Sequence, residues 1–394
     1  MIKATQQQTK AHNRSLLLQL VYDRQQVSRA ELARLTGLTR TTVSGLVAEL
    51  IQEGLVEEVG LGPSVGGKPP TLLQIVADSR SLLGVDLASH EFHGAVVNLR
   101  GQVQYRYSIP LKGDAEVDPL ERVYELVDGL LPMCKSPILG IGIGTPGLVN
   151  SEQGIVRYSV NLDWRNLPLG ANLKERYHLP VCVANDCQAA ALAETTFGAN
   201  KNTPNLIVVK VGRGIGSGIV LNGRLYGGDD FCGGEIGHMV ISDEDVDCRC
   251  GHKGCLEAVA SSQAILTRVQ AAFSSSPVLS QMVHSPQEVD LQVLINAYHA
   301  GDTLILSELK RIGMYLGIAF ANLVSVLNIH KIVLAGSLVV GASDGIIPSA
   351  YETMWNRSLD LLGKEMVLET SRLGNDIVVL GAAALLMQAE LGLV

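Results

Sequence analysis

The chain has 394 residues, of which 47% are hydrophobic and 18% are charged, and 41 are glycine. This composition is typical of compact α/β folds with many turns, and it excludes the disordered and fibrous classes. Domains usually hold about 100–200 residues, so we expect two or three of them. The net charge of −8 excludes a protein that coats nucleic acid over its whole surface, because phosphate binding needs a local excess of Lys and Arg.

The charge is divided unevenly along the chain. Residues 1–45 carry a net charge of +5 and the remainder carries −13. A basic N-terminal segment on an acidic body is typical of a DNA-binding module fused to another domain. No stretch reaches roughly 18 uninterrupted apolar residues, and the polar start MIKATQQQTK lacks the apolar core of a signal peptide. We therefore expect a cytoplasmic protein without a membrane span.

The first segment with a clear pattern predicts a helix-turn-helix. Ser28 and Glu31 form the S-x-x-E pattern of a capping box, which starts a helix at 29–35, and Gly37 supplies the turn. Thr39 is a candidate N-cap for the second helix. Apolar residues then recur at helical spacing: Val43, Leu46, Val47, Leu50 and Ile51. An earlier apolar helix at 16–21 would complete a three-helix core.

Polar and basic side chains occupy the start of the second helix, away from its apolar face. In a helix-turn-helix this part of the second helix enters the major groove of DNA. Strand-like segments at 55–60 and 71–76 flank a turn-rich tip and predict a wing. The predicted DNA-contacting residues are Arg29, Thr39, Arg40, Thr41, Thr42, Ser44 and Lys68. A three-helix protein-interaction module that never touches DNA is the alternative.

Strand-like and helical segments alternate from Leu82 onward, which favours an α/β fold. Strands are expected at 82–87, 94–99, 103–109, 138–144, 179–186 and 205–211, and a helix at 120–131. Asn222-Gly223 fits the type I′ turn of a β-hairpin. Two α/β lobes are therefore expected.

The most specific chemistry lies between residues 237 and 257. His238, Cys248, Cys250 and Cys255 form an H-x9-C-x-C-x4-C pattern, a ligand set typical of closed tetrahedral zinc sites. Four protein ligands leave no coordination position for a reactive water, so the predicted zinc is structural. His252 is the rival histidine, and ordinary buried cysteines are the alternative. The other cysteines are interpreted as core residues: Cys134, Cys182, Cys187 and Cys232.

Several segments together carry a resemblance to a known family. They are GIGTPGLV (142–149), NLDW (161–164), LPVCVAND (179–186), GRGIGSGIVLNG (212–223) and GGEIGHMVISDEDVDCRCGHKGCLEAVAS (233–261). In this order they resemble the ROK family of repressors and sugar kinases, over nearly the whole chain. The N-terminal SRAELARLTGLTRTTVSGLVAELIQEGLV and GGKPPTLL resemble the DNA-binding half that the family's repressors have and its kinases lack.

The resemblance implies an actin-like body of the sugar kinase/ribonuclease H-like class, with sugar bound in a cleft between two lobes. The implied domains are a winged helix-turn-helix at 1–78, a first α/β lobe at 79–183 plus about 377–394, and a second lobe at 184–376. The implied sugar contacts are Asn161, Asn185, Asp186, Glu235, His238 and Glu257. Carboxylates and amides suit this role because they form paired hydrogen bonds with neighbouring hydroxyls.

The resemblance also raises the question of catalysis. Asp186 matches the base that accepts a proton from the sugar hydroxyl in the family's kinases. The kinases' phosphate-binding pattern D-x-G-G-T reads DLASH at 86–90 here, and His90 would crowd a nucleotide phosphate. The second glycine run, GRGIGSG at 212–218, is mostly intact. We therefore expect no catalytic residue and interpret Asp186 as a retained sugar ligand.

Together these patterns predict a sugar-responsive repressor of carbohydrate metabolism genes. It would act as a homodimer or higher homo-oligomer on operator double-stranded DNA, with a monosaccharide effector and structural Zn²⁺. Two alternatives stay open at this point. One is an active ATP-dependent sugar kinase with an appended DNA-binding module, and the other is a regulator controlled by a protein partner.

Overall fold

A computed structural model describes residues 5–63, 69–88, 91–111, 118–201, 203–359 and 365–393. The chain forms two compact units. The first comprises Met1–Ile143, Pro168–Val183 and Ala382–Val394, and the second Gly144–Leu167 and Ala184–Gly381. The segment 144–167, which the sequence placed in the first lobe, lies in the second unit. The three domain boundaries stay predictions.

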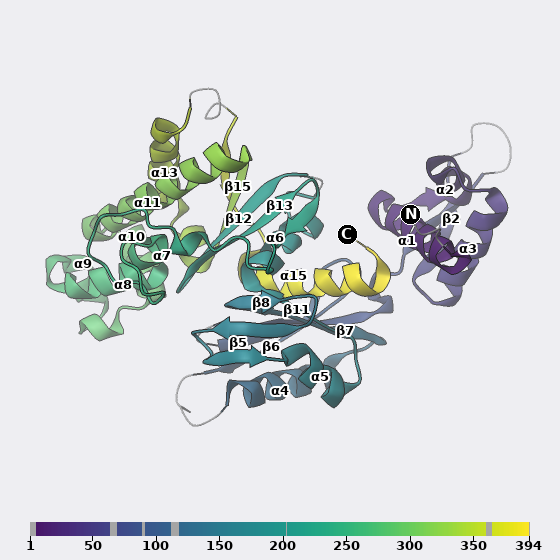
Figure 1. The fold of residues 1–394 in the computed structure, drawn as a ribbon, viewed down its shortest axis with the longest axis horizontal. Coiled ribbons are helices and arrows are strands. Elements are labelled where there is room, and N and C mark those ends of the chain that lie inside the picture. The colour runs from purple at the N-terminus through teal and green to yellow at the C-terminus, as the bar shows by residue number, and fades with distance from the viewer. Residues whose placement is uncertain are drawn as a thin grey trace. The chain divides into compact units, whose positions relative to one another are not determined.

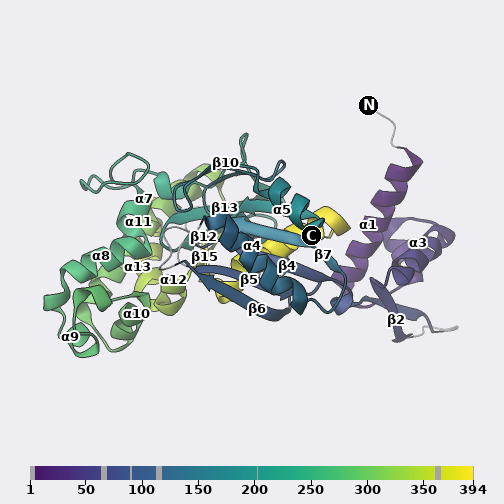
Figure 2. The same ribbon diagram turned by 90° about the horizontal axis from the view of Figure 1, so that it is seen from below.

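The N-terminal module of the first unit consists of three helices and a small sheet (Figure 2). Its elements are α1 (Gln6–Arg24), β1 (Val27–Ser28), α2 (Arg29–Thr36), α3 (Arg40–Gln52), β2 (Val56–Leu61) and β3 (Thr71–Ile75). The sheet has the order β1-β3-β2, and the antiparallel pair of β2 and β3 forms the predicted wing. The wing residues 64–68 lie outside the described residues.

Local sequence signals explain where α2 and α3 begin and end. The Ser28 hydroxyl accepts a hydrogen bond from the Glu31 amide at 3.2 Å, and Gly37 ends α2 at φ +71°, where glycine is favoured. The Thr39 hydroxyl accepts from the Thr42 amide at 3.2 Å and starts α3. The predicted apolar face is buried at Val43, Leu46, Val47 and Leu50. The predicted helix-turn-helix is confirmed.

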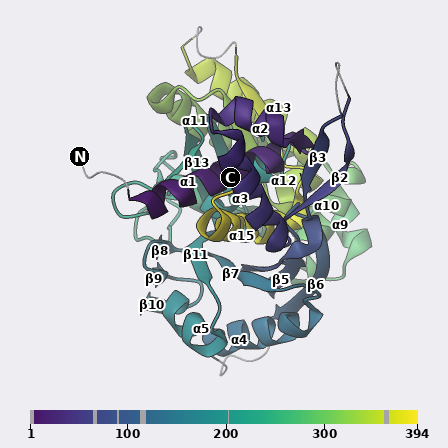
Figure 3. The ribbon, with the colours of Figure 1, turned by 90° about the vertical axis from the view of Figure 1, so that its right-hand side faces the viewer.

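The rest of the first unit is built on a five-stranded sheet with the order β11-β7-β4-β5-β6. The strands are β4 (Ser81–Asp86), β5 (Glu91–Val97), β6 (Val103–Pro110), β7 (Ile138–Thr145) and β11 (Val181–Asn185). The helices α4 (Pro119–Leu130) and α5 (Leu169–Tyr177) lie on one face (Figure 3). α15 (Ile377–Leu386) covers the other face so closely that a Cβ on Gly142 would lie 1.9 Å from the Ala382 carbonyl oxygen.

The second unit has a five-stranded sheet with the order β14-β13-β12-β15-β16. The strands are β12 (Leu206–Val211), β13 (Ile215–Leu221), β14 (Arg224–Tyr226), β15 (Lys331–Ala335) and β16 (Val367–Thr370). Asn222 and Gly223 form the predicted turn at φ +52° and +74°. Each large sheet has its first strand in the centre, its second and third strands on one side and its fourth and fifth on the other. This repeated topology confirms the actin-like α/β body.

Helices (Figure 1) and a second, smaller sheet (Figure 3) complete the second unit. The helices are α6 (Asp186–Thr196), α7 (Leu256–Ala260), α8 (Ser262–Ala271), α9 (Pro277–Met282), α10 (Leu291–His299), α11 (Thr303–Leu327), α12 (Ser337–Gly341) and α13 (Ser343–Arg357). The small sheet contains β8 (Leu148–Asn150), β9 (Ile155–Ser159) and β10 (Trp164–Leu167). α11 packs tightly on α13. The close approach is seen at Gly317, where a Cβ would lie only 2.4 Å from the Ala350 carbonyl oxygen.

Two helical segments, Thr303–Leu327 and Gly374–Leu391, are long and apolar enough to cross a membrane by length and composition. Neither segment contains an uninterrupted apolar run of roughly 18 residues, which is the feature on which the expectation of no span rests. In each segment 61% of the most apolar window is buried within the fold. Because buried core helices pass the same test, these segments are weak evidence for a membrane span.

Candidate functional site

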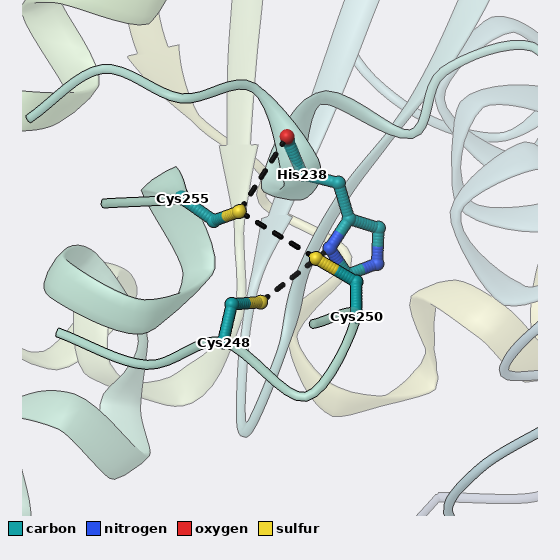
Figure 4. A group of neighbouring side chains, drawn as sticks. All are labelled: His238, Cys248, Cys250 and Cys255. Atoms are coloured by element: carbon teal, nitrogen blue, oxygen red, sulfur yellow. Dashed lines mark hydrogen bonds between the residues drawn. The ribbon is translucent and has the colours of Figure 1, made fainter. Parts of the chain in front are cut away.

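The four predicted metal ligands converge in the second unit (Figure 4). His238 ends the short 3₁₀ turn Ile236–His238, Cys248 and Cys250 lie in the loop that follows, and Cys255 directly precedes α7. The ligand atoms of all four residues lie within 4.8 Å of one another. Nδ1 of His238 faces the sulfur atoms. The residues therefore form a Cys/His cluster able to hold a metal ion.

Two distances between donor atoms of the cluster fit those around a tetrahedral zinc ion. The sulfurs of Cys250 and Cys255 are 3.6 Å apart, and the Cys248 sulfur lies 3.7 Å from Nδ1 of His238. Zinc bonds of about 2.3 Å to sulfur and about 2.0 Å to nitrogen place tetrahedral ligand atoms roughly 3.5–3.8 Å apart. Nδ1 of the rival His252 is 3.4 Å from the Cys250 sulfur, but the mutually close group contains His238.

The thiols of the cluster differ in their pKa values. A hydrogen bond from the His252 backbone lowers the pKa of Cys250 to about 6. Burial raises the pKa of Cys255 to about 12 and also raises the pKa of Cys248. Thiolates are the form that binds metal, and a bound cation deprotonates coordinating thiols outright. Of the three thiols, Cys250 is therefore the most readily ionised.

The loop that carries the cysteines is fixed at two further points. Glu244 accepts hydrogen bonds from Arg311 and Tyr315, both on α11. Nη1 of Arg249 donates to the side-chain oxygen of Asn161 at 2.8 Å, in the turn between β9 and β10. Through Arg249, the loop that carries the cysteines thus connects the predicted sugar contact Asn161 to the Cys/His cluster.

Asn185 stands where β11 ends and α6 begins. Its side-chain oxygen accepts from the amides of Cys187 and Gln188 at 2.8 and 3.2 Å, and its side-chain nitrogen donates to the Gly147 carbonyl at 3.0 Å. Asn185 is therefore the N-cap of α6, a role that the sequence analysis did not assign. Its contact with a sugar stays a prediction.

Asp186, the next residue, forms an ion pair with Lys210, which the sequence analysis missed. The Lys210 nitrogen lies 2.6 Å from Oδ2 of Asp186, and the side chains are 20% and 14% exposed. Burial acts to raise the pKa of Asp186, but the Lys210 charge and hydrogen bonds from Lys210 and Cys187 outweigh it and hold the pKa below its usual value. A lysine within the apolar strand NLIVVKV was the available signal, because buried charges are almost always paired.

Glu235 and Glu257 complete a group of three carboxylates with Asp186. Burial raises the pKa of Glu235, His238 lowers it, and the charges of Asp186 and Glu257 raise it. Oε2 of Glu257 accepts a hydrogen bond from the Ile215 amide at 3.0 Å. The fold therefore brings Glu235 within electrostatic reach of Asp186, Glu257 and His238.

Two segments of this chain correspond to the glycine-rich phosphate-binding patterns of the kinases, DLASH at 86–90 and GRGIGSG at 212–218, and the structure describes only the second completely. Ser89 and His90 lie outside the described residues, so the expected loss of the first phosphate cradle stays a prediction. The second run forms the β12–β13 turn, where the Gly212 amide donates to the Gly214 carbonyl at 2.9 Å. A Cβ on Gly214 would lie 2.4 Å from Oε2 of Glu257. Here glycine is needed for the close approach of a carboxylate.

The predicted DNA-contacting residues of α3 and its N-cap lie at the surface. The exposed residues are Thr39, Arg40, Thr41, Thr42 and Ser44. The hydroxyls of Thr39 and Thr42 are 2.9 Å apart, so both belong to the cap as well. Arg29 pairs with Glu58 of the wing strand β2 at 2.7 Å. Lys68 lies outside the described residues.

Comparison with known proteins places both parts of the chain. Residues 82–389 match the model of the ROK family, and residues 12–62 match that of the MarR family. The chain belongs to the ROK family. Its architecture is a MarR-type winged helix followed by a ROK body, as predicted.

Relatives of this ROK protein include repressors and kinases. The xylose repressor of Bacillus subtilis is 31% identical over 394 residues, which is 99% of each chain. A crystal structure of a ROK family transcriptional regulator, a homologue of the Escherichia coli MLC protein, has a TM-score of 0.83 at 30% identity and covers 98% of both chains. A glucokinase of Halalkalibacterium halodurans is 33% identical over 319 residues, 79% of this chain and 96% of the glucokinase.

Proposed function

We propose that this ROK protein is a sugar-responsive, DNA-binding repressor of carbohydrate metabolism genes. The observation that carries the proposal is the full-length similarity to the Bacillus subtilis xylose repressor, which includes the winged-helix module as well as the body. The glucokinase, by contrast, matches only 79% of this chain. The exposed polar start of α3 and the carboxylate group of the second unit are the two sites that such a regulator needs.

The proposed effector is a monosaccharide, held by Asn161, Asn185, Asp186, Glu235, His238 and Glu257. Carboxylates accept hydrogen bonds from vicinal hydroxyls, and a sugar that lacks one hydroxyl leaves a buried acceptor unpaired. Because Nδ1 of His238 faces the sulfurs, its Nε2 is the atom directed to a hydroxyl. The relatives' names supply D-xylose and D-glucose as first probes.

The proposed cofactor is one structural Zn²⁺ bound by His238, Cys248, Cys250 and Cys255. The donor distances support this assignment. Zinc would cross-link the loop between the turn at 236–238 and α7. It would also fix the ring of His238, because coordination of one ring nitrogen sets the direction of the other.

The proposed regulation requires the sugar to bind two conformations of the protein unequally. In the simplest scheme the sugar favours the form that does not bind DNA, and so acts as an inducer. A cytoplasmic homodimer would present two α3 helices to successive half-sites of an operator. This arrangement is part of the proposal and rests on the winged-helix module and the repressor relatives.

A mobility-shift assay with the promoter of the chain's own operon tests the DNA-binding claim. The parent protein should bind, and Arg40→Ala should weaken binding roughly tenfold, since a base or phosphate contact contributes about 1–3 kcal/mol. Arg224→Ala is the matched control, because Arg224 is exposed on β14 of the body. Equal binding by Arg40→Ala and the parent would refute the choice of recognition helix. Absence of binding by the parent would refute the repressor.

The second candidate is an active ATP-dependent sugar kinase with an appended DNA-binding module. The glucokinase similarity and the retained Asp186 favour it. Release of ADP that depends on both ATP and a sugar would establish this activity.

The remaining alternative is a regulator controlled by a protein partner, and such a regulator would bind no sugar at all.

A further inference from the structure

Lys210 carries the positive charge that contacts the carboxylate group. It lies near the end of β12, and its nitrogen lies 2.6 Å from Oδ2 of Asp186 at the start of α6. Glu235 lies within electrostatic reach of both Asp186 and Glu257. Of these three acidic residues, Asp186 is the one in direct contact with Lys210.

Carboxylates that share an enclosed site repel one another, and one of them takes up a proton unless a cation compensates. The Lys210 nitrogen, 2.6 Å from Oδ2, supplies such a cation to Asp186 and holds the pKa of that carboxyl below its usual value. The ion pair thus favours the ionised form of Asp186.

The protonation state of Asp186 determines what it can recognise. An ionised carboxylate only accepts hydrogen bonds, whereas a protonated one also donates. A carboxylate that is stabilised by a lysine is also a weaker proton acceptor, and general-base catalysis depends on that strength. One contact can therefore favour hydroxyl binding and disfavour proton removal from the same hydroxyl.

Building on the proposed sugar site, we propose that Lys210 is a positioning residue that keeps Asp186 an ionised hydrogen-bond acceptor for a sugar hydroxyl. The titratable groups that face Asp186 are Lys210 from β12 and Cys187 from its own helix, whose sulfur is 3.5 Å from Oδ1. Glu235 also lies within electrostatic reach of Asp186.

Calorimetric titration of the full chain with D-xylose, D-glucose and N-acetyl-D-glucosamine, at about pH 7.5 and about pH 5.5, tests this role. Lys210→Met keeps the side-chain length and removes the charge. From about pH 7.5 to about pH 5.5, the sugar affinity of Lys210→Met should fall by a factor at least about fivefold larger than that of the parent. The reason is that Asp186 becomes protonated in the variant at the lower pH. Lys210→Arg should restore the parent's pH profile. If Lys210→Met does not fold, Lys210→Gln takes its place.

Lys331→Met is the matched control. Lys331 lies on the neighbouring strand β15 and pairs with Glu369 at 3.0 Å, with its side chain 25% exposed. Its loss should leave the pH profile of sugar binding unchanged. If the parent binds sugar and Lys210→Met shows the parent's profile, the role of Lys210 is refuted and the sugar site stands. If the parent binds none of the three sugars, the proposed sugar site fails and this inference fails with it.

Discussion

Arg311 donates to both carboxylate oxygens of Glu244, at 2.7 and 2.6 Å. The pair ties the loop that precedes Cys248 to the long helix α11. The hydroxyl of Tyr315 makes a third hydrogen bond to Glu244. The loop therefore has an attachment to the body that does not depend on a metal ion.

Glu244→Gln should lower the free energy of unfolding by about 1 kcal/mol, a modest value because the side chains of Glu244 and Arg311 are more than one third exposed. The hydrogen bonds from Tyr315 and Arg311 lower the pKa of Glu244, and burial opposes them. A carboxyl with a lowered folded-state pKa stabilises the protein above its unfolded-state pKa, and this contribution is lost as pH falls through the folded-state value.

Urea unfolding of the parent and of Glu244→Gln at several pH values measures this effect. The difference between them should be constant from about pH 7 to about pH 5 and should shrink below about pH 4. Glu125→Gln is the control, since Glu125 pairs with Arg122 on the surface of α4. A difference that stays constant down to about pH 3 would show that the charge of Glu244 does not stabilise the loop.

Zinc should copurify with the parent protein at one ion per chain. Cys255→Ser removes a buried ligand and should abolish that zinc and lower the thermal midpoint. The loss in stability should be about 4 kcal/mol where free zinc exceeds its dissociation constant about 1,000-fold. Elemental analysis and calorimetry measure the two effects. Cys134→Ser, outside the cluster, should retain the zinc, and a zinc-free parent of equal stability would contradict the site.

Substitutions of Thr39 and Thr41 should distinguish the effect of helix capping on stability from the effect of a DNA contact on operator binding. Thr39→Ala removes the N-cap of α3 and should lower stability by about 1 kcal/mol. Thr41 is exposed, so Thr41→Ala should leave stability unchanged and weaken operator binding roughly fivefold. Thermal unfolding and a mobility-shift titration give the two numbers. An intact operator affinity for Thr41→Ala would remove this residue from the DNA contacts.

The protein should release no ADP when supplied with ATP, Mg²⁺ and a monosaccharide that it binds. Phosphoryl transfer depends almost entirely on positioning and electrostatics, and Asp186 is here paired with Lys210. A coupled ADP assay over a panel of hexoses and pentoses is the measurement. ADP release that depends on both ATP and the sugar would show that the chain is an enzyme, and ordinary kinases turn over at about 1 per second or faster.

The elements of the winged helix and the Cys/His cluster were predictable because their signals are local. The cap at Ser28, the turn at Gly37 and the apolar spacing along 43–51 each act within a few residues. The four residues of the Cys/His cluster lie within 238–255, so their spacing alone was informative. Local chemistry and the final structure agree in both places.

The electrostatics of the carboxylate group could not be predicted in the same way. Asp186 and Lys210 are 24 residues apart in sequence, and only the packing of α6 against β12 brings them together. Asn185 matches a sugar-contacting position in the sequence, and in the fold its side chain also bonds the Cys187 and Gln188 amides and the Gly147 carbonyl. Residues with several possible partners need the fold before a role can be assigned.

The most direct test of the central claim is the affinity for a labelled operator, measured by fluorescence anisotropy with and without a monosaccharide and in the absence of ATP. We predict that one of D-xylose, D-glucose or N-acetyl-D-glucosamine changes the affinity at least about tenfold, or about 1.4 kcal/mol, and is recovered unmodified. Tight operator binding that none of these sugars alters would contradict a sugar-responsive repressor.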